Sequence, residues 1–155
     1  MSRHDIAVIW AAFFSKCQRL LLAGPVFFKR GSTYYILPGT GCCACKGGSS
    51  IFVFTSEHPL GPYRFRGDVG SNTTAPFDAH SPYNYVTRAQ ASAVVRVDSA
   101  AHGAQFLWMG NAWDTAEQPG QPRNHTLLYF YPLEFAADGS IEQVRREASV
   151  QVYSR

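Results

Sequence analysis

The chain has 155 residues, which is enough for one ordinary domain and too few for two large ones. Hydrophobic residues make up 46% of it and charged residues 16%, a balance that excludes a disordered chain. The net charge of +3 comes with 14 scattered Lys and Arg residues, so no basic run indicates nucleic acid as a partner. Aromatics at 14%, together with 13 Gly and 9 Pro, favour an all-β chain with many turns.

Residues 1–22 differ in pattern from the rest of the chain. Phe14, Cys17 and Leu21 recur at spacings of three and four residues, which is typical of a helix. The apolar run Ile6–Phe14 is too short to span a bilayer, so no membrane association is expected from it. It fits the core of a signal peptide, or else a stretch that is not the native upstream sequence. We expect a helical or signal-like segment here and, on the signal interpretation, a secreted or extracellular protein.

Short strands follow from Pro25 onward, separated by turns and polar loops. The predicted strands cover residues 26–30, 33–37, 51–54, 63–66, 93–97, 105–109, 127–135, 141–144 and 150–153. Gly31 and Ser32 form the turn of the first hairpin. The continuous apolar run Ile51–Phe54 predicts a strand that is buried on both faces. Residues 69–90 and 110–123 are long polar loops, the kind that often carry function.

These strands group into two four-stranded antiparallel units, residues 26–68 and 93–146. Consecutive four-stranded units are the pattern of β-propeller blades. A single blade cannot bury both of its faces and needs neighbours that close the ring. We therefore expect an exposed apolar face, and partners in the form of missing propeller blades or self-association.

No pattern for a metal or an organic cofactor stands out. Cys42, Cys43 and Cys45 lie in one Gly-rich stretch, and no matching Cys or His pair follows at zinc-finger spacing. We interpret them as a surface loop with free thiols or one local disulfide. Neither a phosphate-binding loop nor a dinucleotide-binding motif is present, so the expected cofactor is none.

Four blocks of residues, in the same order, resemble glycoside hydrolase family 43, in its β-1,3-galactanase-like branch. The blocks are Phe27-Phe28-Lys29-Arg30-Gly31 with Tyr34-Tyr35-Ile36-Leu37, Ser56-Glu57-His58-Pro59-Leu60-Gly61-Pro62-Tyr63 with Gly67-Asp68, Phe106-Leu107-Trp108-Met109-Gly110-Asn111 with Trp113, and Tyr131-Pro132-Leu133-Glu134-Phe135 with Asp138-Gly139. Each block alone is weak evidence, whereas four in order are specific. The resemblance covers about residues 23–146.

The resemblance implies a partial five-bladed β-propeller, to which this chain supplies about the last two blades as a C-terminal fragment. The domain prediction is a helical or signal-like segment at 1–22 followed by a glycosidase-type propeller part at 23–155. Family members hydrolyse glycosidic bonds with an acid and an activated water, most of them using an Asp base from the first blade. That first blade is absent here. The position of the acid Glu holds Ala23, and Asn111 and Ala112 stand where this branch usually carries Asp and Arg.

Gln90 is the catalytic-site residue that the resemblance carries over. It lies in Arg88-Ala89-Gln90-Ala91-Ser92, which resembles the segment whose Gln lines the galactanase site and takes the place of the Asp base. The alternative is a structural Gln that hydrogen-bonds to backbone at a blade edge.

Other candidates are weaker. Trp113 is a candidate substrate-binding residue because an aromatic ring stacks on the C–H face of a sugar. His80 is a second one, lining the funnel or binding a metal for which no further ligands are assigned. We expect Glu57 and Glu134 to be surface carboxylates and Trp108 to be part of the core.

The functional hypothesis is hydrolysis of glycosidic bonds in a polysaccharide, with galactan as the substrate, by a protein of which this chain is an incomplete part. The alternative is a non-catalytic carbohydrate-binding or structural propeller remnant. Because Ala23 cannot donate a proton, we do not expect this chain to catalyse hydrolysis alone.

Overall fold

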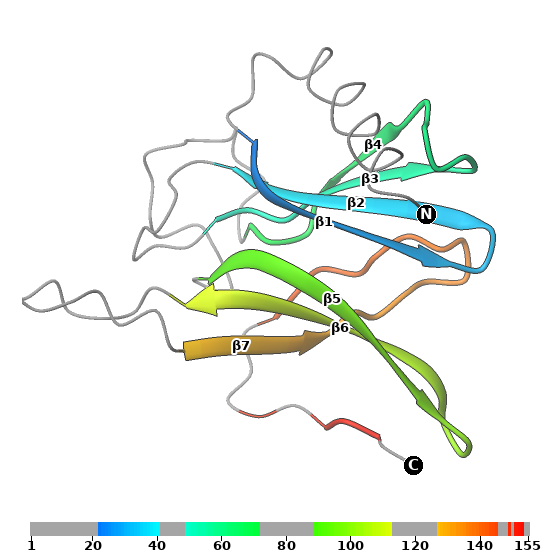
Figure 1. Ribbon diagram of the computed structural model, residues 1–155, viewed down its shortest axis with the longest axis vertical. Helices are drawn as coiled ribbons and strands as arrows, with labels where there is room; N and C mark the ends of the chain where they lie inside the picture. The colour runs from blue at the N-terminus through cyan, green and yellow to red at the C-terminus, as the bar shows by residue number, and fades with distance from the viewer. Residues whose placement is uncertain are drawn as a thin grey trace, which may run out of the picture.

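A computed structural model describes residues 22–40, 49–71, 89–112, 127–145, 149 and 151–153 of the chain. In these residues all regular structure is β (Figure 1). The strands are β1 (Leu22–Arg30), β2 (Thr33–Thr40), β3 (Phe52–Ser56), β4 (Arg64–Asp68), β5 (Ala89–Ser99), β6 (Gly103–Ala112) and β7 (Leu127–Pro132). They form a four-stranded sheet, β1-β2-β3-β4, and a three-stranded sheet, β5-β6-β7, each antiparallel throughout. The described residues contain no helix of the length and apolar character that crossing a bilayer requires.

The first sheet begins with the predicted hairpin. Arg30 pairs with Thr33 around the two-residue turn, where Gly31 has φ 58°, a left-handed conformation that suits glycine. Along the hairpin, side chains alternate between the two faces of the sheet. Every residue of β3 is buried, which confirms the prediction for the run Ile51–Phe54.

The turn between β3 and β4 explains the second motif block in structural terms. The Ser56 Oγ accepts a hydrogen bond from the His58 backbone N–H at 3.0 Å, and the Gly61 N–H donates to the His58 carbonyl, also at 3.0 Å. The Tyr63 hydroxyl donates to the Pro59 carbonyl at 2.8 Å. Glu57 is exposed in this turn, as expected of a surface carboxylate. Residues 56–63 of the second motif block therefore form a turn that is stabilised by hydrogen bonds among its own residues.

The second sheet differs from its prediction in the bounds of its strands and in their number. Its first strand starts at Ala89, four residues before the predicted start at Ala93, because β5 continues past a bulge between Ala91 and Ala93. Strand β6 is longer than the predicted 105–109, and β7 ends at Pro132, before the predicted end at residue 135. The fourth strand predicted at 141–144 is reduced, within the described residues, to one antiparallel bridge between Phe135 and Ile141.

Residues 142–145 connect the second sheet to the segment that follows β4. On the side of the second sheet, the Glu142 N–H donates to the Glu134 carbonyl at 2.9 Å and the Tyr129 hydroxyl donates to the Arg145 carbonyl at 3.3 Å. The Val144 N–H donates to the Val69 carbonyl at 2.9 Å, and the Gln143 side-chain amide donates to the carbonyls of Val69 and Ser71, each at 2.9 Å. This segment ties the two sheets together. The fold prediction of two antiparallel blades of a propeller thus holds, with four strands in one sheet and three in the other.

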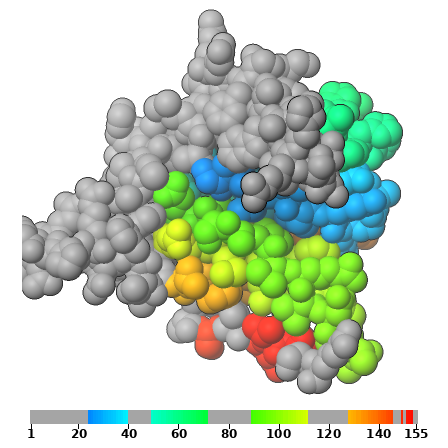
Figure 2. Space-filling view, in the orientation of Figure 1, coloured from blue at the N-terminus to red at the C-terminus, as the bar shows by residue number. Residues whose placement is uncertain are grey.

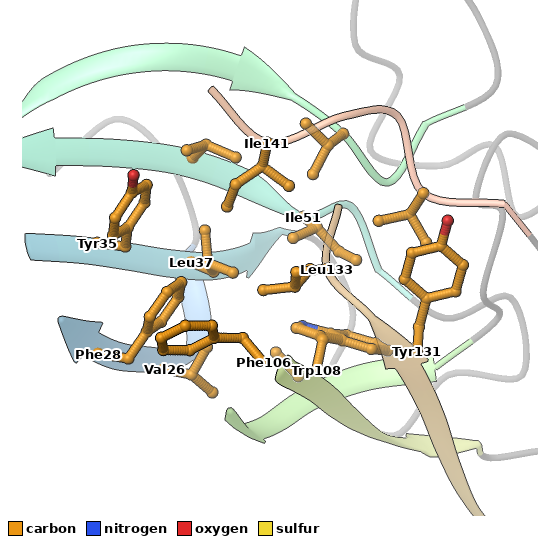
Figure 3. Close-up of a cluster of buried hydrophobic side chains, with 14 of the residues drawn as sticks. Val26, Phe28, Tyr35, Leu37, Ile51, Phe106, Trp108, Tyr131, Leu133 and Ile141 are labelled. Atoms are coloured by element: carbon orange, nitrogen blue, oxygen red, sulfur yellow. The ribbon is translucent and has the colours of Figure 1, made fainter. Parts of the chain in front are cut away.

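A shared hydrophobic core lies between the two sheets (Figure 3). Phe28 stacks on Tyr35 in the first sheet, with 4.9 Å between the ring centroids, and meets Phe106 of the second sheet at 5.4 Å. Trp108 is fully buried, which confirms it as a core residue. Full burial of a large apolar side chain contributes about 1.5–3 kcal/mol, so this interface holds the pair of sheets together. The core side chains labelled in Figure 3 are Val26, Phe28, Tyr35, Leu37, Ile51, Phe106, Trp108, Tyr131, Leu133 and Ile141.

The face of the second sheet turned away from this core is partly exposed. Val95 is 41% exposed, Phe130 37% and Leu128 50%. We call this surface, formed by alternate residues of β5, β6 and β7, the outer face. Its exposure agrees with the expectation that the isolated pair of sheets leaves apolar surface uncovered.

The C-terminal residues 151–153 lie against this second sheet, as the red atoms beside the green β5–β6 surface show in Figure 2. The Gln105 side-chain amide donates to the Gln151 carbonyl at 3.0 Å and accepts from the Tyr153 N–H at 3.4 Å. The predicted last strand at 150–153 is therefore wrong for residues 151–153, which form no strand. The side-chain amide of Gln105 bonds to them, and strand pairing does not.

The remaining sequence predictions fall on residues outside the described ranges. These are the N-terminal segment up to residue 21, the three clustered cysteines, and most of the two long polar loops.

Candidate functional site

The first strands of the two sheets lie against each other (Figure 1). Gly24 in β1 has φ 55°, and a Cβ atom placed on it would lie 2.7 Å from the carbonyl oxygen of Ala91 in β5. The same atom would lie 3.6 Å from Nε2 and 3.7 Å from Cγ of Gln90. Only glycine fits this approach, because its neighbour is a backbone oxygen that cannot rotate away.

Both strands are irregular where they meet. The register shifts between Ala23 and Val26 in β1, and between Ala91 and Ala93 in β5. Bulges bend a strand and redirect its side chains, and they often occur beside functional sites. Here they bring Gln90 against Gly24, the residue that follows Ala23.

Gln90 is held within the sheet and not in a loop before it. It is the second residue of β5 and is 7% exposed. The preceding carbonyl, that of Ala89, accepts hydrogen bonds from the Ser49 backbone N–H at 3.3 Å and from its Oγ at 3.4 Å. These bonds from the segment that precedes β3 anchor the start of β5, and so they position the glutamine.

Gln90 pairs directly with Asn111 of β6, which pairs in turn with Leu128 of β7. Residues directly opposite each other in antiparallel strands share one face of the sheet, with Cβ atoms about 4.5–5.5 Å apart. The three residues thus form a row across the sheet, which we call the amide row. Asn111 is half-buried and Leu128 is half-exposed.

The position assigned to the acid contains no acid. Ala23 lies in β1, where its backbone pairs with Gly39, and its side chain is a methyl group. An alanine has no proton to donate, and the amides of Gln90 and Asn111 do not titrate near neutral pH. The described parts of β1, β5 and β6 at this site therefore offer hydrogen bonding without acid–base chemistry.

The carboxylates among the described residues serve turns or face solvent. The Asp68 Oδ1 accepts from the backbone N–H groups of Ile51, at 3.1 Å, and Gly70, at 2.8 Å. The Ser140 hydroxyl and N–H both donate to Asp138, which lowers the pKa of that carboxyl below its usual range. The other four are Asp98, which is paired with Arg96 at 2.8 Å, and the exposed Glu57, Glu134 and Glu142.

Two predicted site residues, His80 and Trp113, lie outside the described residues, so the structure does not place them relative to Gln90. Within the described ranges, no three His, Cys, Asp or Glu side chains are grouped so that they could hold a metal ion. The sequence reasoning missed Gly24 and Leu128. A glycine before a proline at the start of a strand was a signal for Gly24, whereas only the strand register places Leu128 beside Asn111.

Comparison with known proteins shows which solved structures share this fold. No protein-family profile matches the sequence, and no curated protein matches it either. Among solved structures, an exo-β-1,3-galactanase from Clostridium thermocellum matches 78% of this chain with a TM-score of 0.59 at 19% identity. A family 43 β-1,3-galactosidase described with galactodeoxynojirimycin matches 81% with a TM-score of 0.53 at 17% identity. This chain has the fold of part of a family 43 β-propeller.

A third structure of the same kind is an exo-β-1,3-galactanase from Phanerochaete chrysosporium. It is a variant with one glutamate replaced by alanine, described with β-1,3-galactotriose, and it matches 80% of this chain with a TM-score of 0.51 at 19% identity. The matched parts are 23%, 32% and 24% of the three proteins, so the chain spans a quarter to a third of their length. The resemblance found in the motif blocks is thus confirmed at the level of the fold.

Proposed function

We propose that this chain is part of a glycoside hydrolase-type protein that acts on a galactan-type polysaccharide, and that Gln90 contacts the sugar. One observation carries the proposal. The glutamine assigned by the family resemblance is buried at the start of β5, directly against Gly24, the residue that follows the acid position. Two segments that are distant in sequence, and that the resemblance assigns to one site, are thus in contact at this point.

The choice of substrate rests on chemistry and on the related structures. An amide donates and accepts hydrogen bonds at once, which suits the hydroxyl groups of a neutral sugar. The proteins that share this fold include β-1,3-galactanases and a β-1,3-galactosidase, one of them described with β-1,3-galactotriose. We therefore assign β-1,3-linked galactan as the polysaccharide to test first.

In this proposal the described residues bind and orient the sugar, and other residues transfer the protons. Hydrolysis requires a proton donor for the leaving oxygen and a group that activates water. Gln90 can orient a water molecule or a sugar hydroxyl, but an amide does not accept a proton near neutral pH. The acid would then be a carboxylate outside the described sheets.

A second candidate function is carbohydrate binding without hydrolysis. Ala23 at the acid position favours it, together with an amide row that contains no titratable group. The two candidates share the sugar site and differ only in whether a bond is cleaved.

The proposal is tested with the 155-residue protein. Its binding to soluble β-1,3-galactan is measured by affinity gel electrophoresis, and the release of galactose is measured in the same samples. We expect Gln90→Ala to weaken binding about 5- to 10-fold, since a lost hydrogen bond costs about 1–1.5 kcal/mol. The control Gln151→Ala removes an exposed amide from the C-terminal segment and leaves binding unchanged.

The outcomes separate the alternatives. Galactose release by the wild-type protein supports hydrolysis and excludes the second candidate. Binding without release is expected of both candidates, because the chain is an incomplete part, and failure to bind galactan contradicts both. Equal binding by the wild type and the Gln90→Ala variant would remove Gln90 from the site.

A further inference from the structure

The row that contains Gln90 extends across all three strands of the second sheet. Gln90 of β5 is opposite Asn111 of β6, and Asn111 is opposite Leu128 of β7. Burial decreases along the row, from Gln90 at 7% exposed, through the half-buried Asn111, to Leu128 at 50%. The row lies on the outer face, at the end of the sheet where β5 begins. Its most buried member, Gln90, lies beside Gly24, and its most exposed member, Leu128, lies on β7.

The side chains of this row differ in chemistry along its length. Two amides stand next to each other, and each has one acceptor oxygen and two donor hydrogens. A half-exposed leucine follows. Ligand sites combine a few converging polar groups with apolar surface, and a sugar ring offers hydroxyl groups at its edge and C–H groups on its face. The order amide, amide, leucine matches a pyranose that places its hydroxyls on the amides and a C–H face on Leu128.

We infer that Asn111 is a specificity-determining residue of the proposed galactan site, where it binds a sugar hydroxyl beside the one bound by Gln90. The inference rests on the proposed function and goes beyond it, because it adds a second polar contact and an apolar platform. Side chains opposite each other have Cβ atoms about 4.5–5.5 Å apart, so both amides reach groups on one sugar residue.

The backbone around Asn111 supports this role. Gly110 precedes it, and a Cβ atom there would lie 2.4 Å from the Trp108 ring and 2.8 Å from Cβ of Ala89. Trp108 is fully buried, so it cannot move aside for a larger residue. Only glycine therefore fits at position 110, and the pairing of β5 with β6 places Asn111 directly opposite Gln90.

The test measures binding of galactose-terminated β-1,3-galactan oligosaccharides in which single hydroxyls of the terminal sugar are replaced by hydrogen. For the wild-type protein, we expect the loss of either contacted hydroxyl to weaken binding about 5- to 10-fold. For Asn111→Ala, we expect a similar loss with the complete sugar and no further loss with one of the deoxy sugars. Binding by the Gln90→Ala variant should be unaffected by the loss of a different hydroxyl.

Further variants and controls complete the design. Leu128→Ala should weaken binding to every sugar by a similar factor, since an apolar contact does not distinguish hydroxyls. Circular dichroism and urea unfolding check that each variant is folded, and Asn111→Ser replaces Asn111→Ala if the alanine variant is not. The amide of Gln151 lies away from the row, so Gln151→Ala is the matched control.

The possible failures are distinguishable. If the wild type does not bind galactan, the proposed function fails and this inference fails with it. If the wild type binds and Gln90→Ala weakens binding, while the Asn111 variants bind every sugar as the wild type does, only the inference is overturned.

Discussion

Replacing Gly24 with alanine tests the contact on which the candidate site depends. Gly24 has φ 55°, and an added Cβ atom would lie 2.7 Å from the Ala91 carbonyl oxygen. Gly31 provides a matched control, because it has φ 58° in the β1–β2 turn and no atom within 4 Å of its added Cβ. The two substitutions impose the same left-handed backbone on alanine and differ in the steric contact alone.

The expected magnitudes follow from these two terms. A left-handed conformation costs an alanine about 1–2 kcal/mol, which is the whole expected loss of unfolding free energy for Gly31→Ala. Gly24→Ala adds an overpacked contact, which typically costs about 1–3 kcal/mol, because β1 and β5 must move apart. The total for Gly24→Ala is therefore about 2–5 kcal/mol. The melting temperature of Gly24→Ala should therefore lie below that of Gly31→Ala by about 2–4 °C for each kcal/mol of difference in unfolding free energy.

Urea unfolding followed by tryptophan fluorescence measures both variants, and galactan binding is measured in parallel. We expect Gly24→Ala to be the less stable variant and also to bind galactan more weakly, because the shift of β5 moves Gln90. Gly31→Ala should bind like the wild type. Equal losses of stability for the two variants would refute the close approach of β1 and β5.

Two further changes test the turn and the outer face. Burial and, to a smaller extent, the nearby Tyr34 raise the pKa of Tyr63 from 10.0 to about 12. Its neutral form therefore contributes stability that is complete below pH 10 and lost as the pH rises through 12. In an absorbance titration, Tyr63→Phe should have one fewer tyrosine that ionises near pH 12, and an unchanged amplitude there would contradict the assignment. Phe130, 37% exposed on the edge strand β7, should promote self-association of the chain. We expect Phe130→Lys to reduce the increase of the sedimentation coefficient with protein concentration. The control Leu60→Lys changes an exposed turn residue and should leave that increase as in the wild type. The same increase in both variants would exclude the outer face as the surface through which the chains associate.

Much of the fold was predictable because it depends on short-range patterns. The hairpin around Gly31 follows from a turn glycine between two apolar runs, and the buried β3 follows from the run Ile51–Phe54. The pairing of 93–97 with 105–109 was also correct, although β5 starts earlier than predicted. Local patterns did not predict that β5 extends back to Ala89, because the bulge after Ala91 breaks the regular alternation of side chains.

The candidate site was predictable only in part. Gln90 and Ala23 came from resemblance to a family, and neither residue type by itself indicates a site. The amide row depends on the register between β5, β6 and β7, which a one-residue slip would change completely. The sequence indicated Asn111 only as a departure from the family pattern, and it did not indicate Leu128 as a residue of the site.

The amino-acid sequence by itself determined where most of the strands and the tight turns lie and that Trp108 belongs to the core, because these depend on side-chain periodicity and on turn-forming residues. The tertiary structure alone decided that Gly24 meets Gln90 and that the Val144 N–H bonds to the carbonyl of Val69, the residue that follows β4. These contacts join positions far apart in the chain. They form only when two apolar sheet faces pack together, and the packing of the whole core, not any local pattern, sets which residues then become neighbours.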